Sequence, residues 1–462
     1  MKKTNLTIED IFEIPTAVIC NPDAFKNVYN VSIDSRNIKK NTLFIAIKGE
    51  RLDGHDFINQ AVQNGASSIM INENKLKNID DYNLTVITVK DTTRALGEIA
   101  KIWRSKLKAK VIGITGSAGK TTTKEILATI CSSKFKVNKT VANNNNHIGV
   151  PLTILSTNGK HNVLIAELGT NHFGEITYTA SIVKPDYSLI TNIGDSHLEY
   201  LKDRKGVLKE KSALFDETIK NNGKVFINND DTMLKNYGKK IKNKITYAMK
   251  DKADYSAEVI KYDSNARPEV KIKSKKVSMK IKLPLSGDAN IGNYLAAVSI
   301  ASEIGLGKEK IVKSTKKIKS FAKRLEIKNH KKFTLINDTY NANPDSMRSS
   351  LNILNSISNK KRKIAILGDM FELGKESKIK HEELAGYANN LKIDEIYSIG
   401  DSMKLFNNKL NSHNKVHGHF SDRNSLKVLL KKIKLDSSAV LVKGSRGMKM
   451  EEFVAVLESR KN

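Results

Sequence analysis

The chain has 462 residues, with 79 Lys and Arg against 49 Asp and Glu, which gives a formal net charge of +30. This length predicts two to four domains, no apolar run is long enough to span a bilayer, and the two cysteines, Cys20 and Cys131, exclude a disulfide framework and lack metal-ligand spacing. We therefore expect a cytoplasmic protein without a membrane span. The charge is compatible with anionic partners, but the lysines are spread along the chain without interleaved aromatics, so compositional bias is favoured over nucleic-acid binding.

Residues 1–107 are predicted to form a first α/β domain. Its expected strands are 42–47, 67–71 and 84–89, and its expected helices are 57–64 and 91–107. Two polar clusters, at 33–36 and 49–57, flank the first of these strands. Loops with several convergent polar groups can hold an anionic or sugar-like ligand; the alternative is a pair of solvated turns.

The second region, residues 108–316, opens with a glycine-rich turn. A β-branched run at 111–115 predicts a buried strand, and a helical pattern follows at 122–130. Glycines between a strand and a helix leave backbone N–H groups and the positive end of the helix dipole directed at one spot, which is how proteins bind phosphate. Lys120 can reach terminal phosphates, and the Thr121 hydroxyl can hold magnesium.

The spacing in this turn departs from the usual phosphate-binding loop, because Ile114 stands where that motif has a glycine. An ordinary glycine-rich turn is the alternative. The order of strand, glycines, Lys-Thr and helix favours a nucleotide site.

Other strands of this region alternate with helices, which predicts a mostly parallel sheet. These strands are expected at 163–167, 188–191 and 224–227, followed by an antiparallel extension within 247–284. Ligands of such sheets gather at the carboxyl ends of the strands, where Glu167 and His197 stand. Magnesium prefers oxygen ligands, so Thr121 and Glu167 are natural partners. His197 is a less usual ligand, and a structural histidine is the alternative.

Lys211 is the least expected residue of the region. The run at 206–215 predicts a helix in which apolar residues stand three and four positions from Lys211 on both sides. A buried lysine is costly unless it is paired or neutral, and a neutral amine can add carbon dioxide to become an anionic carbamate beside a metal. The alternative, favoured by the local sequence alone, is a lysine that extends to solvent.

The loop at 143–151 carries Asn145 and Asn146. Their amides can bind substrate or nucleotide where the fold brings them near the phosphate loop. A solvated loop is an equal alternative.

Residues 317–462 are predicted to form another α/β unit. Its expected strands are 334–337, 363–367, 395–399 and 439–442, and its expected helices include 381–391 and 425–433. Without a G-x-G-x-x-G pattern it is not a dinucleotide domain. The loop at 337–347 is crowded with hydrogen-bonding groups, and the loop at 443–447 opens a helix, a place for anions. Polar turns are the alternative for both, and solvated surface is favoured for Arg324 and the loop at 368–370.

Taken together, these motifs resemble the Mur ligases, a family of cell-wall peptide synthetases, over nearly the whole chain. The resemblance is carried by 33–36, Gly54, His55, 115–121, Asn145, Asn146, Gly149, 166–169, Asn192, His197, Lys211, 338–344 and 443–446. The last two strings favour the member of the family that adds D-alanyl-D-alanine. The sequence departs from the family at Ala289, commonly histidine, and at Lys323 and Ser212, commonly glycine.

The resemblance implies an α/β protein of three domains. These are a small N-terminal α/β domain that binds UDP, a central P-loop ATPase-like domain with a mostly parallel sheet, and a C-terminal Rossmann-like α/β domain. The implied activity is an ATP-dependent ligase, acting as a monomer, that forms an acyl phosphate and joins D-alanyl-D-alanine to UDP-N-acetylmuramoyl tripeptide. Another Mur ligase, folylpolyglutamate synthetase and a nucleic-acid-dependent P-loop ATPase are the alternatives.

The resemblance also assigns roles to individual residues. ATP is expected at Thr115, Gly116, Ser117, Ala118, Gly119, Lys120, Thr121, Asn290, Asn293 and Arg324. Two magnesium ions are expected at Thr121, Glu167, His197 and a carbamylated Lys211, with Lys120, His197 and Lys211 as the catalytic residues. The two substrates are expected at Ser35, Arg36, Asp53, Gly54, His55, Asn145, Asn146, Asp338, Tyr340, Asn341, Asn343, Lys443 and Arg446.

Overall fold

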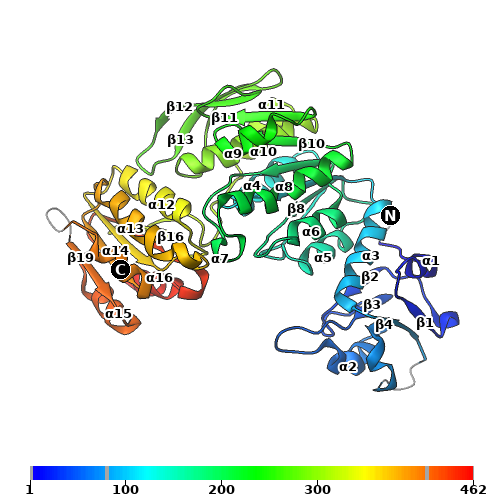
Figure 1. Ribbon diagram of the computed structural model, residues 1–462. Coiled ribbons are helices and arrows are strands. Elements are labelled where there is room, and N and C mark those ends of the chain that lie inside the picture. Colours follow the sequence, from blue (N-terminus) through cyan, green and yellow to red (C-terminus); the bar gives the residue numbers. More distant parts are fainter. Residues whose placement is uncertain (1–3, 79–82, 412–415, 461–462) are drawn as a thin grey trace.

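The computed structural model describes residues 4–78, 83–411 and 416–460. Within these ranges the chain forms three α/β domains, each built on its own sheet, with the N-terminal and C-terminal domains on opposite sides of the central one (Figure 1). The predicted fold class is therefore confirmed. Among the described residues, none of the helices combines the length and the apolarity that crossing a bilayer would require.

The N-terminal domain has a mostly parallel sheet in the order β1-β5-β4-β3-β2, with β1 antiparallel to β5. Its elements are α1 (Ile8–Phe12), β1 (Val18–Cys20), η1 (Pro22–Ala24), β2 (Asn30–Ser32), β3 (Thr42–Ile45), η2 (Gly54–Phe57), α2 (Ile58–Gln63), β4 (Ala66–Asn72), η3 (Glu73–Asn78), β5 (Thr85–Val89) and α3 (Thr92–Lys106). The predicted strand at 42–47 ends earlier, and the predicted helix at 57–64 is shorter and preceded by a 3₁₀ turn.

Helix α3 attaches this domain to the central domain. Asp91 caps its first turn by accepting hydrogen bonds from the backbone of Thr93 and Arg94 at 2.8 and 3.0 Å, as a good N-cap residue does. At its other end, Trp103 Nε1 donates to the carbonyl of Thr157 at 2.7 Å and Arg104 Nε donates to that of Val183 at 2.7 Å. Buried side chains of α3 pack in one apolar cluster with central-domain helices, so the two domains share a core.

The central sheet runs in the order β14-β13-β12-β11-β10-β9-β6-β8-β7 and is parallel except for its β12–β14 end. Its strands are β6 (Lys110–Thr115), β7 (Val137–Lys139), β8 (Val163–Glu167), β9 (Tyr187–Ile190), β10 (Lys224–Asn228), β11 (Lys244–Ala248), β12 (Tyr255–Tyr262), β13 (Pro268–Lys273) and β14 (Ser278–Lys282). Its helices are α4 (Lys120–Cys131), α5 (Gly149–Leu155), α6 (Glu175–Val183), α7 (Leu198–Leu201), α8 (Arg204–Lys220), α9 (Thr232–Gly238), α10 (Asp288–Glu303) and α11 (Lys308–Thr315). The predicted antiparallel extension is confirmed.

Strand β6 lies inside this sheet, between β8 and β9. Its residues from Val111 to Thr115 are buried, as expected for a parallel strand covered on both faces. Ile112 and Ile114 pack with helices α4 and α10, whereas Val111 belongs to the cluster of α5, α6 and α8 on the other face. The predicted helix after the glycine turn begins two residues earlier, at Lys120.

The C-terminal sheet has the order β15-β16-β20-β17-β18-β19, with β15 antiparallel to β16. Its strands are β15 (Glu326–Asn329), β16 (Phe333–Asp338), β17 (Arg362–Gly368), β18 (Glu395–Ile399), β19 (Val416–Phe420) and β20 (Ser438–Lys443). Its helices are α12 (Pro344–Ser356), η4 (Gly374–Glu376), α13 (Ser377–Asn389), α14 (Asp401–Asn408), α15 (Arg423–Lys432), η5 (Arg446–Met448) and α16 (Glu451–Glu458).

The segment that leads into β15 explains one departure from the family. Lys323 adopts a left-handed backbone with φ of +62°, a conformation in which glycine carries no steric cost. Glycine, which Mur ligases commonly have here, therefore suits this backbone, and Lys323 adopts it in this chain. Its ammonium group pairs with Glu451 of α16 at 3.1 Å.

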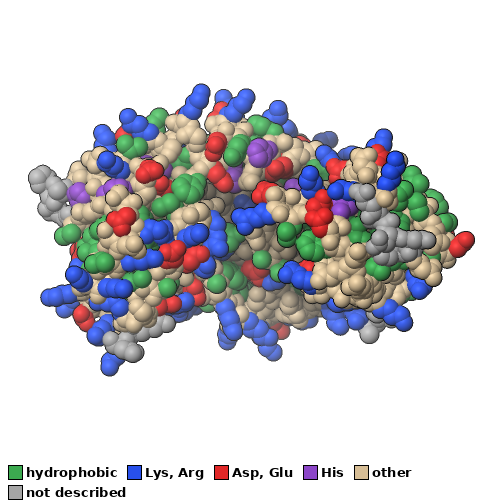
Figure 2. Space-filling model, turned by 90° about the horizontal axis from the view of Figure 1, so that it is seen from below, with side chains coloured by type: hydrophobic (Ala, Val, Ile, Leu, Met, Phe, Trp, Pro, Cys, Tyr) green, Lys and Arg blue, Asp and Glu red, His purple; other side chains and the backbone are tan. Residues whose placement is uncertain are grey.

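Basic side chains are scattered over one face of the molecule (Figure 2). The face seen in Figure 2 carries Lys and Arg over most of its area, interspersed with acidic and apolar side chains. This distribution agrees with a compositional origin of the net charge.

Candidate active site

The phosphate loop between β6 and α4 requires both of its glycines. Gly116 has φ of +145°, and a Cβ there would lie 1.9 Å from Thr191 Oγ1. Gly119 has φ of +80°, and a Cβ there would lie 2.4 Å from Asn293 Oδ1. Any side chain at either position would be strained and would collide with a neighbour. The shifted glycine spacing is therefore a property of this loop's own backbone path.

The residues after β9 hold the loop in shape. Asn192 Oδ1 accepts a hydrogen bond from the backbone N–H of Ala118 at 3.0 Å, and Thr191 Oγ1 donates to the carbonyl of Ala118 at 2.5 Å. The hydroxyl of Ser117 accepts from the backbone of Gly194 at 2.9 Å. The loop is thus preorganised before any ligand arrives.

Lys120 begins helix α4 and crosses the loop. Its Nζ donates to the carbonyl of Gly116 at 2.6 Å. Burial lowers the pKa of Lys120, opposed by the charge of Glu167 and reinforced by that of Arg324. A desolvated lysine at a helix N-terminus attracts phosphate strongly, because little water screens it.

Glu167, at the end of β8, is the acidic group beside this loop. Its Oε1 accepts hydrogen bonds from Thr121 Oγ1 and from Asn145 Nδ2, each at 3.0 Å. Its Oε2 is buried, has no hydrogen-bond partner among the described residues, and lies 3.3 Å from Lys124 Nζ. Sequence analysis predicted the pairing of Thr121 with Glu167, and the structure brings these side chains together.

The donor set here suits magnesium. A threonine hydroxyl and a buried carboxylate are hard oxygen ligands. Within the described part of the chain, no group of three or more His, Cys, Asp and Glu side chains could hold a metal ion by itself. Phosphate oxygens of a nucleotide would have to complete the coordination shell.

Lys211 lies on the inner side of α8 with 1% of its surface exposed. The local alternative of a lysine that extends to solvent is therefore wrong. Burial lowers its pKa well below the usual range, and the nearby charge of Lys120 lowers it further. A neutral amine, the form that reacts with carbon dioxide, is thus favoured.

His197 stands at the start of α7 in a left-handed conformation with φ of +54°. Its Nδ1 lies 2.6 Å from a carboxylate oxygen of Glu372 in the C-terminal domain. The close contact with the His197 ring lowers the pKa of Glu372, against the opposing effect of burial. Metal-binding histidines commonly present one ring nitrogen to the metal and the other to a carboxylate, so this geometry leaves Nε2 available.

The C-terminal loops contact the phosphate loop from the other side. Asn343 caps α12 and its Nδ2 donates to the carbonyl of Ser117 at 3.5 Å. The Arg324 guanidinium lies 3.5 Å from the ring centre of Tyr340, a cation–π contact, so the solvated alternative for Arg324 does not describe its surroundings. Asn341 Oδ1 accepts from the backbone of Arg446 at 3.2 Å, and thus joins the loops after β16 and β20.

Asp338 and Lys443 form a buried ion pair beneath these loops. Lys443 Nζ contacts Asp338 Oδ2 and donates to the carbonyl of Asn341 at 3.1 Å. Asp338 also accepts from Ser350 Oγ at 2.7 Å and from the backbone of Leu325 at 3.0 Å. The two side chains therefore neutralise each other and also fix the shape of the loop after β16.

Asn290 and Asn293 stand on α10, and Asn293 lies beside Gly119 of the phosphate loop. Asn293 Oδ1 accepts from Thr123 Oγ1 at 3.2 Å, and its Nδ2 donates to Asn290 at 3.3 Å. The side-chain oxygen of Asn146, by contrast, accepts a hydrogen bond from the backbone of Gly149, the first residue of α5, at 2.9 Å. Asn145 therefore contacts Glu167, whereas the side-chain oxygen of Asn146 is bonded to the backbone of Gly149.

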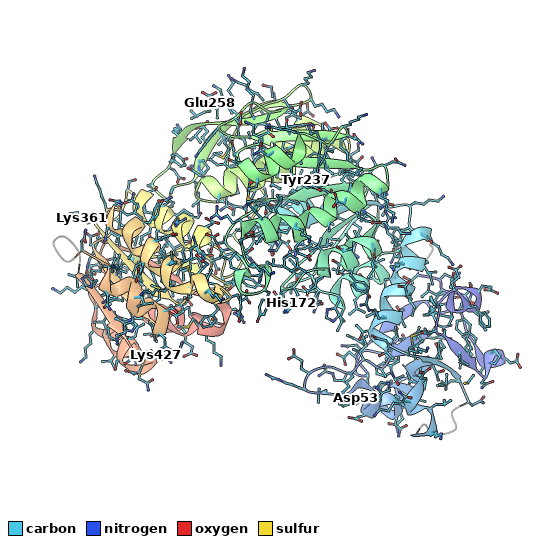
Figure 3. The ribbon with its side chains drawn as sticks, viewed as in Figure 1. Asp53, His172, Tyr237, Glu258, Lys361 and Lys427 are labelled. Carbon is cyan, nitrogen blue, oxygen red and sulfur yellow. The ribbon has the colours of Figure 1, made fainter. Side chains whose placement is uncertain are left out.

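The predicted substrate loops of the N-terminal domain lie away from the C-terminal domain, as the position of Asp53 shows (Figure 3). Asp53 lies 2.6 Å from His55 Nδ1, and His55 Nε2 accepts from the backbone of Asn72 at 3.0 Å. A Cβ at Gly54 would lie 2.6 Å from the backbone of Ile47. These residues shape the loop.

The other N-terminal cluster has one buried and one exposed member. Ser35 is buried and donates to Gln60 at 2.6 Å. Arg36 is exposed and pairs with Asp34 at 2.9 Å. The exposed guanidinium is accessible to an anionic ligand.

An ionic cluster joins the central and C-terminal domains near the site. Buried Asp195 accepts from Arg204 Nε at 2.7 Å and lies 3.5 Å from Lys380 Nζ. Arg204 also lies 3.5 Å from Asp345. The side chain of Asp195 is thus contacted by cations of both domains.

Sequence analysis missed two charged residues of the site. Lys124 is buried in α4 and lies 3.3 Å from Glu167 Oε2. Leu127 and Ala128 stand three and four positions after it, but Lys120 and Thr121 stand four and three positions before it, so the two-sided apolar pattern that singled out Lys211 does not single out Lys124. Glu372 follows the loop at 368–370, for which solvated surface was favoured; Asp369 in that loop is buried and accepts from the backbone of Met403 at 2.7 Å.

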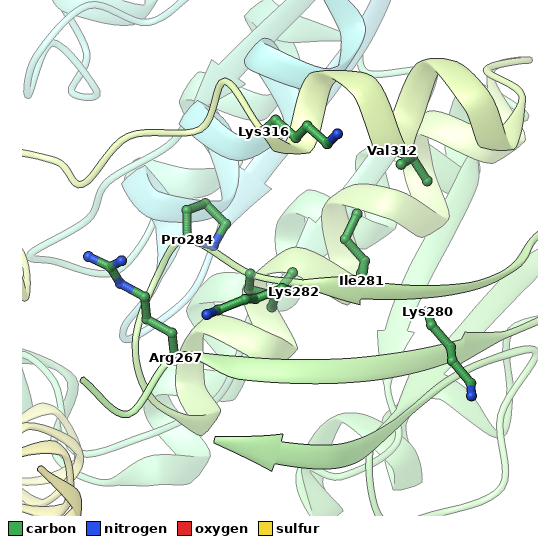
Figure 4. A pocket seen from close by; sticks show the side chains of 8 residues that line it. Arg267, Lys280, Ile281, Lys282, Pro284, Val312 and Lys316 are labelled. Atoms are coloured by element: carbon green, nitrogen blue, oxygen red, sulfur yellow. The ribbon is translucent and has the colours of Figure 1, made fainter. Parts of the chain in front are cut away.

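A separate cavity of about 410 Å³ lies beside the antiparallel end of the central sheet (Figure 4). It is lined by Arg267, Lys280, Ile281, Lys282, Leu283, Pro284, Val312 and Lys316. None of the predicted site residues lines it. The candidate site is therefore the phosphate loop and its surroundings.

Comparisons with known proteins match each of the three domains. Residues 114–301 match the Mur ligase middle domain, residues 323–446 the Mur ligase glutamate ligase domain, and residues 27–104 the catalytic domain of the Mur ligase family. The UDP-N-acetylmuramoyl-tripeptide–D-alanyl-D-alanine ligase of Bacillus subtilis is 32% identical over 97% of both chains.

Solved structures agree. A crystal structure of MurF from Acinetobacter baumannii has a TM-score of 0.89 and 29% identity, and covers 99% of both chains. MurF ligase from Thermotoga maritima in complex with ADP has a TM-score of 0.82 and 26% identity, and covers 93% of this chain and 97% of its own. The similarity therefore extends over the whole fold.

Proposed function

This chain belongs to the Mur ligase family, and from that premise we propose that it is the ATP-dependent ligase that joins D-alanyl-D-alanine to UDP-N-acetylmuramoyl tripeptide. The observation that carries this function is the match over almost the whole chain to relatives with that name. It includes the N-terminal and C-terminal domains, which are proposed below to hold the substrates, as well as the central domain. The product is the UDP-muramoyl pentapeptide, a precursor of peptidoglycan.

The reaction is proposed to begin at the phosphate loop. A carboxylate oxygen of the tripeptide attacks the γ-phosphorus of ATP, the bond to ADP breaks, and an acyl phosphate forms. Two anions must approach each other in this step, and Lys120 supplies positive charge where they meet. The amine of D-alanyl-D-alanine then attacks the acyl carbon, phosphate leaves, and the amine loses a proton.

Magnesium is proposed to bind at Thr121 and Glu167, with His197 and a carbamate on Lys211 serving a second ion. When bound, it would neutralise charge on the phosphates. Support comes from the contact of the Thr121 hydroxyl with the buried carboxylate of Glu167, the carboxylate beside His197 and the lowered pKa of Lys211.

The outer domains are proposed to hold the substrates. The loops of Ser35 and Asp53 would take the UDP group, and the loop of Tyr340 and Asn341 would take the dipeptide beside Arg446. Asn290, Asn293 and Arg324 would surround the nucleotide. The proposed boundaries are 1–107, 108–316 and 317–462, and closure of the third domain would exclude water from the acyl phosphate.

The oligomeric state and the cellular location complete the proposal. The protein would act as a monomer and in the cytoplasm. Both cysteines are free, Cys131 in the core and Cys20 half-buried, which suits a reducing compartment.

Phosphate release measured with ATP, magnesium and UDP-muramoyl tripeptide tests this function. Release should require D-alanyl-D-alanine, and neither glutamate with a folate nor the amino acids used by other Mur ligases should replace it. DNA or RNA should leave the rate unchanged. Absence of dipeptide-dependent release would contradict the proposal.

A further inference from the structure

Lys124 is completely buried although it carries a charged side chain. It lies one helical turn after Lys120 on α4, and its exposed fraction is 0%. Its Nζ donates to the carbonyl of Thr140 at 2.8 Å and lies 3.3 Å from Glu125 Oε1 and 3.3 Å from Glu167 Oε2. A buried ammonium group is tolerated only when it is paired and hydrogen-bonded, and all of these contacts meet that need.

The contacts of Lys124 divide the oxygens of Glu167 between two environments. Oε1 accepts the hydrogen bonds of Thr121 and Asn145 at the phosphate loop, whereas Oε2 faces Lys124. Thr140 links both partners, because its carbonyl accepts from Lys124 and its hydroxyl accepts from the backbone of Glu167 at 2.9 Å. Lys124 thus stands between the carboxylates of Glu125 and Glu167.

We propose that Lys124 is a positioning residue of the nucleotide site: its ammonium group holds Glu167 Oε2 so that Oε1 stays beside the Thr121 hydroxyl. Without that charge, the carboxylates of Glu125 and Glu167 face each other with no cation between them, and like charges repel. Glu167 then turns away from the phosphate loop and is no longer placed for magnesium. The inference rests on the proposed ATP and magnesium site.

The test compares Lys124→Met with Lys139→Met in the full chain. Lys139 pairs with the other carboxylate oxygen of Glu125 and is 37% exposed, so its loss alters the same glutamate without touching Glu167. Binding of ADP is measured by titration calorimetry with and without magnesium chloride. For Lys124→Met we expect the gain in ADP affinity from magnesium to fall about tenfold, and metal-free ADP binding to change less than about twofold.

Lys139→Met should behave as the wild type does. Equal dependence on magnesium in Lys124→Met and Lys139→Met would overturn the inference, as would an equal loss of ADP binding with and without the metal. A wild-type protein that fails to bind ADP with magnesium would instead contradict the proposed function. The two failures are therefore distinguishable.

A double variant keeps the test decisive where Lys124→Met does not fold. Lys124→Met with Glu125→Gln removes the repulsion between the carboxylates but leaves Glu167 Oε2 without its cation. Its gain from magnesium should fall about threefold, between the wild type and the single variant. An unchanged gain in a folded double variant would overturn the inference.

Discussion

The carboxylate of Glu372, in the C-terminal domain, lies 2.6 Å from Nδ1 of His197, in the central domain. Both residues have left-handed backbones, with φ of +64° and +54°. The backbone N–H of Glu199 also donates to the carbonyl of Glu372 at 3.1 Å. Two conformationally costly residues thus meet at the domain interface, which is typical of a functional position.

Glu372→Gln should reduce ligase activity by about 10- to 100-fold, because a carboxylate behind a metal-binding histidine orients its ring and raises its basicity. Phosphate release as a function of magnesium concentration measures the effect. Glu199→Gln, an exposed change on α7, is the matched control. Full activity of Glu372→Gln would show that the contact has no role in the reaction.

Glu167→Gln should lower kcat by about 100-fold or more, since the amide keeps the size of the side chain but loses the charge that binds the metal. Thr121 and Asn145 retain an oxygen acceptor, so folding should be preserved, as circular dichroism can verify. The control is Glu125→Gln, one residue after Lys124. Comparable losses in both variants would contradict a specific role for Glu167.

Lys211→Ala should abolish activity, and a short carboxylic acid should restore part of it by replacing the carbamate. The wild type should lose activity in buffer freed of carbon dioxide and regain it with bicarbonate. Lys205→Ala, an exposed change on the same helix, should retain its activity without an added carboxylic acid. A fully active Lys211→Ala protein would reject the carbamate.

Lys211 should also make stability depend on pH in buffer freed of carbon dioxide. Because its pKa in the folded protein lies well below the usual 10.5, the unfolded chain binds more protons between these two pKa values, and stability rises with pH across that window. Lys211→Met removes this dependence. Its melting temperature should exceed that of the wild type by at least about 2 °C at neutral pH, and the gap should narrow towards pH 10.

Parallel melting temperatures of the two proteins at every pH would contradict a lowered pKa of the buried Lys211. Burial raises the pKa of Tyr247, so this residue also makes stability depend on pH, but it does so equally in both proteins. The difference between the proteins therefore isolates Lys211.

Much of the central domain could be predicted from its sequence. Strand β8 (Val163–Glu167) matches the prediction residue for residue, because a strand covered on both faces is a continuous apolar run with sharp ends. Edge strands such as β1 and β15 were missed, since they are short and only partly buried. Their pairing is decided by neighbours distant in sequence.

The site was predictable where chemistry follows a strand directly. Thr121 and Glu167 stand at the ends of adjacent elements, so parallel topology alone brings them together. Glu372 could not be found this way, because its contact with His197 depends on how the central and C-terminal domains pack together. Lys124 could not be found from the pattern that singled out Lys211, because Lys120 and Thr121 precede it on the same face; its burial is explained by its partners Glu125 and Glu167.

The attachment of α3 to the central domain fixes the distance between the N-terminal domain and the phosphate loop. Trp103 and Arg104 bind carbonyl groups of the central domain, and the two domains share one apolar cluster. In the proposed function the UDP group binds in the N-terminal loops, and these contacts then set its distance from Lys120. The carboxylate of a UDP-sugar with too short a peptide would then not extend as far as the phosphate loop.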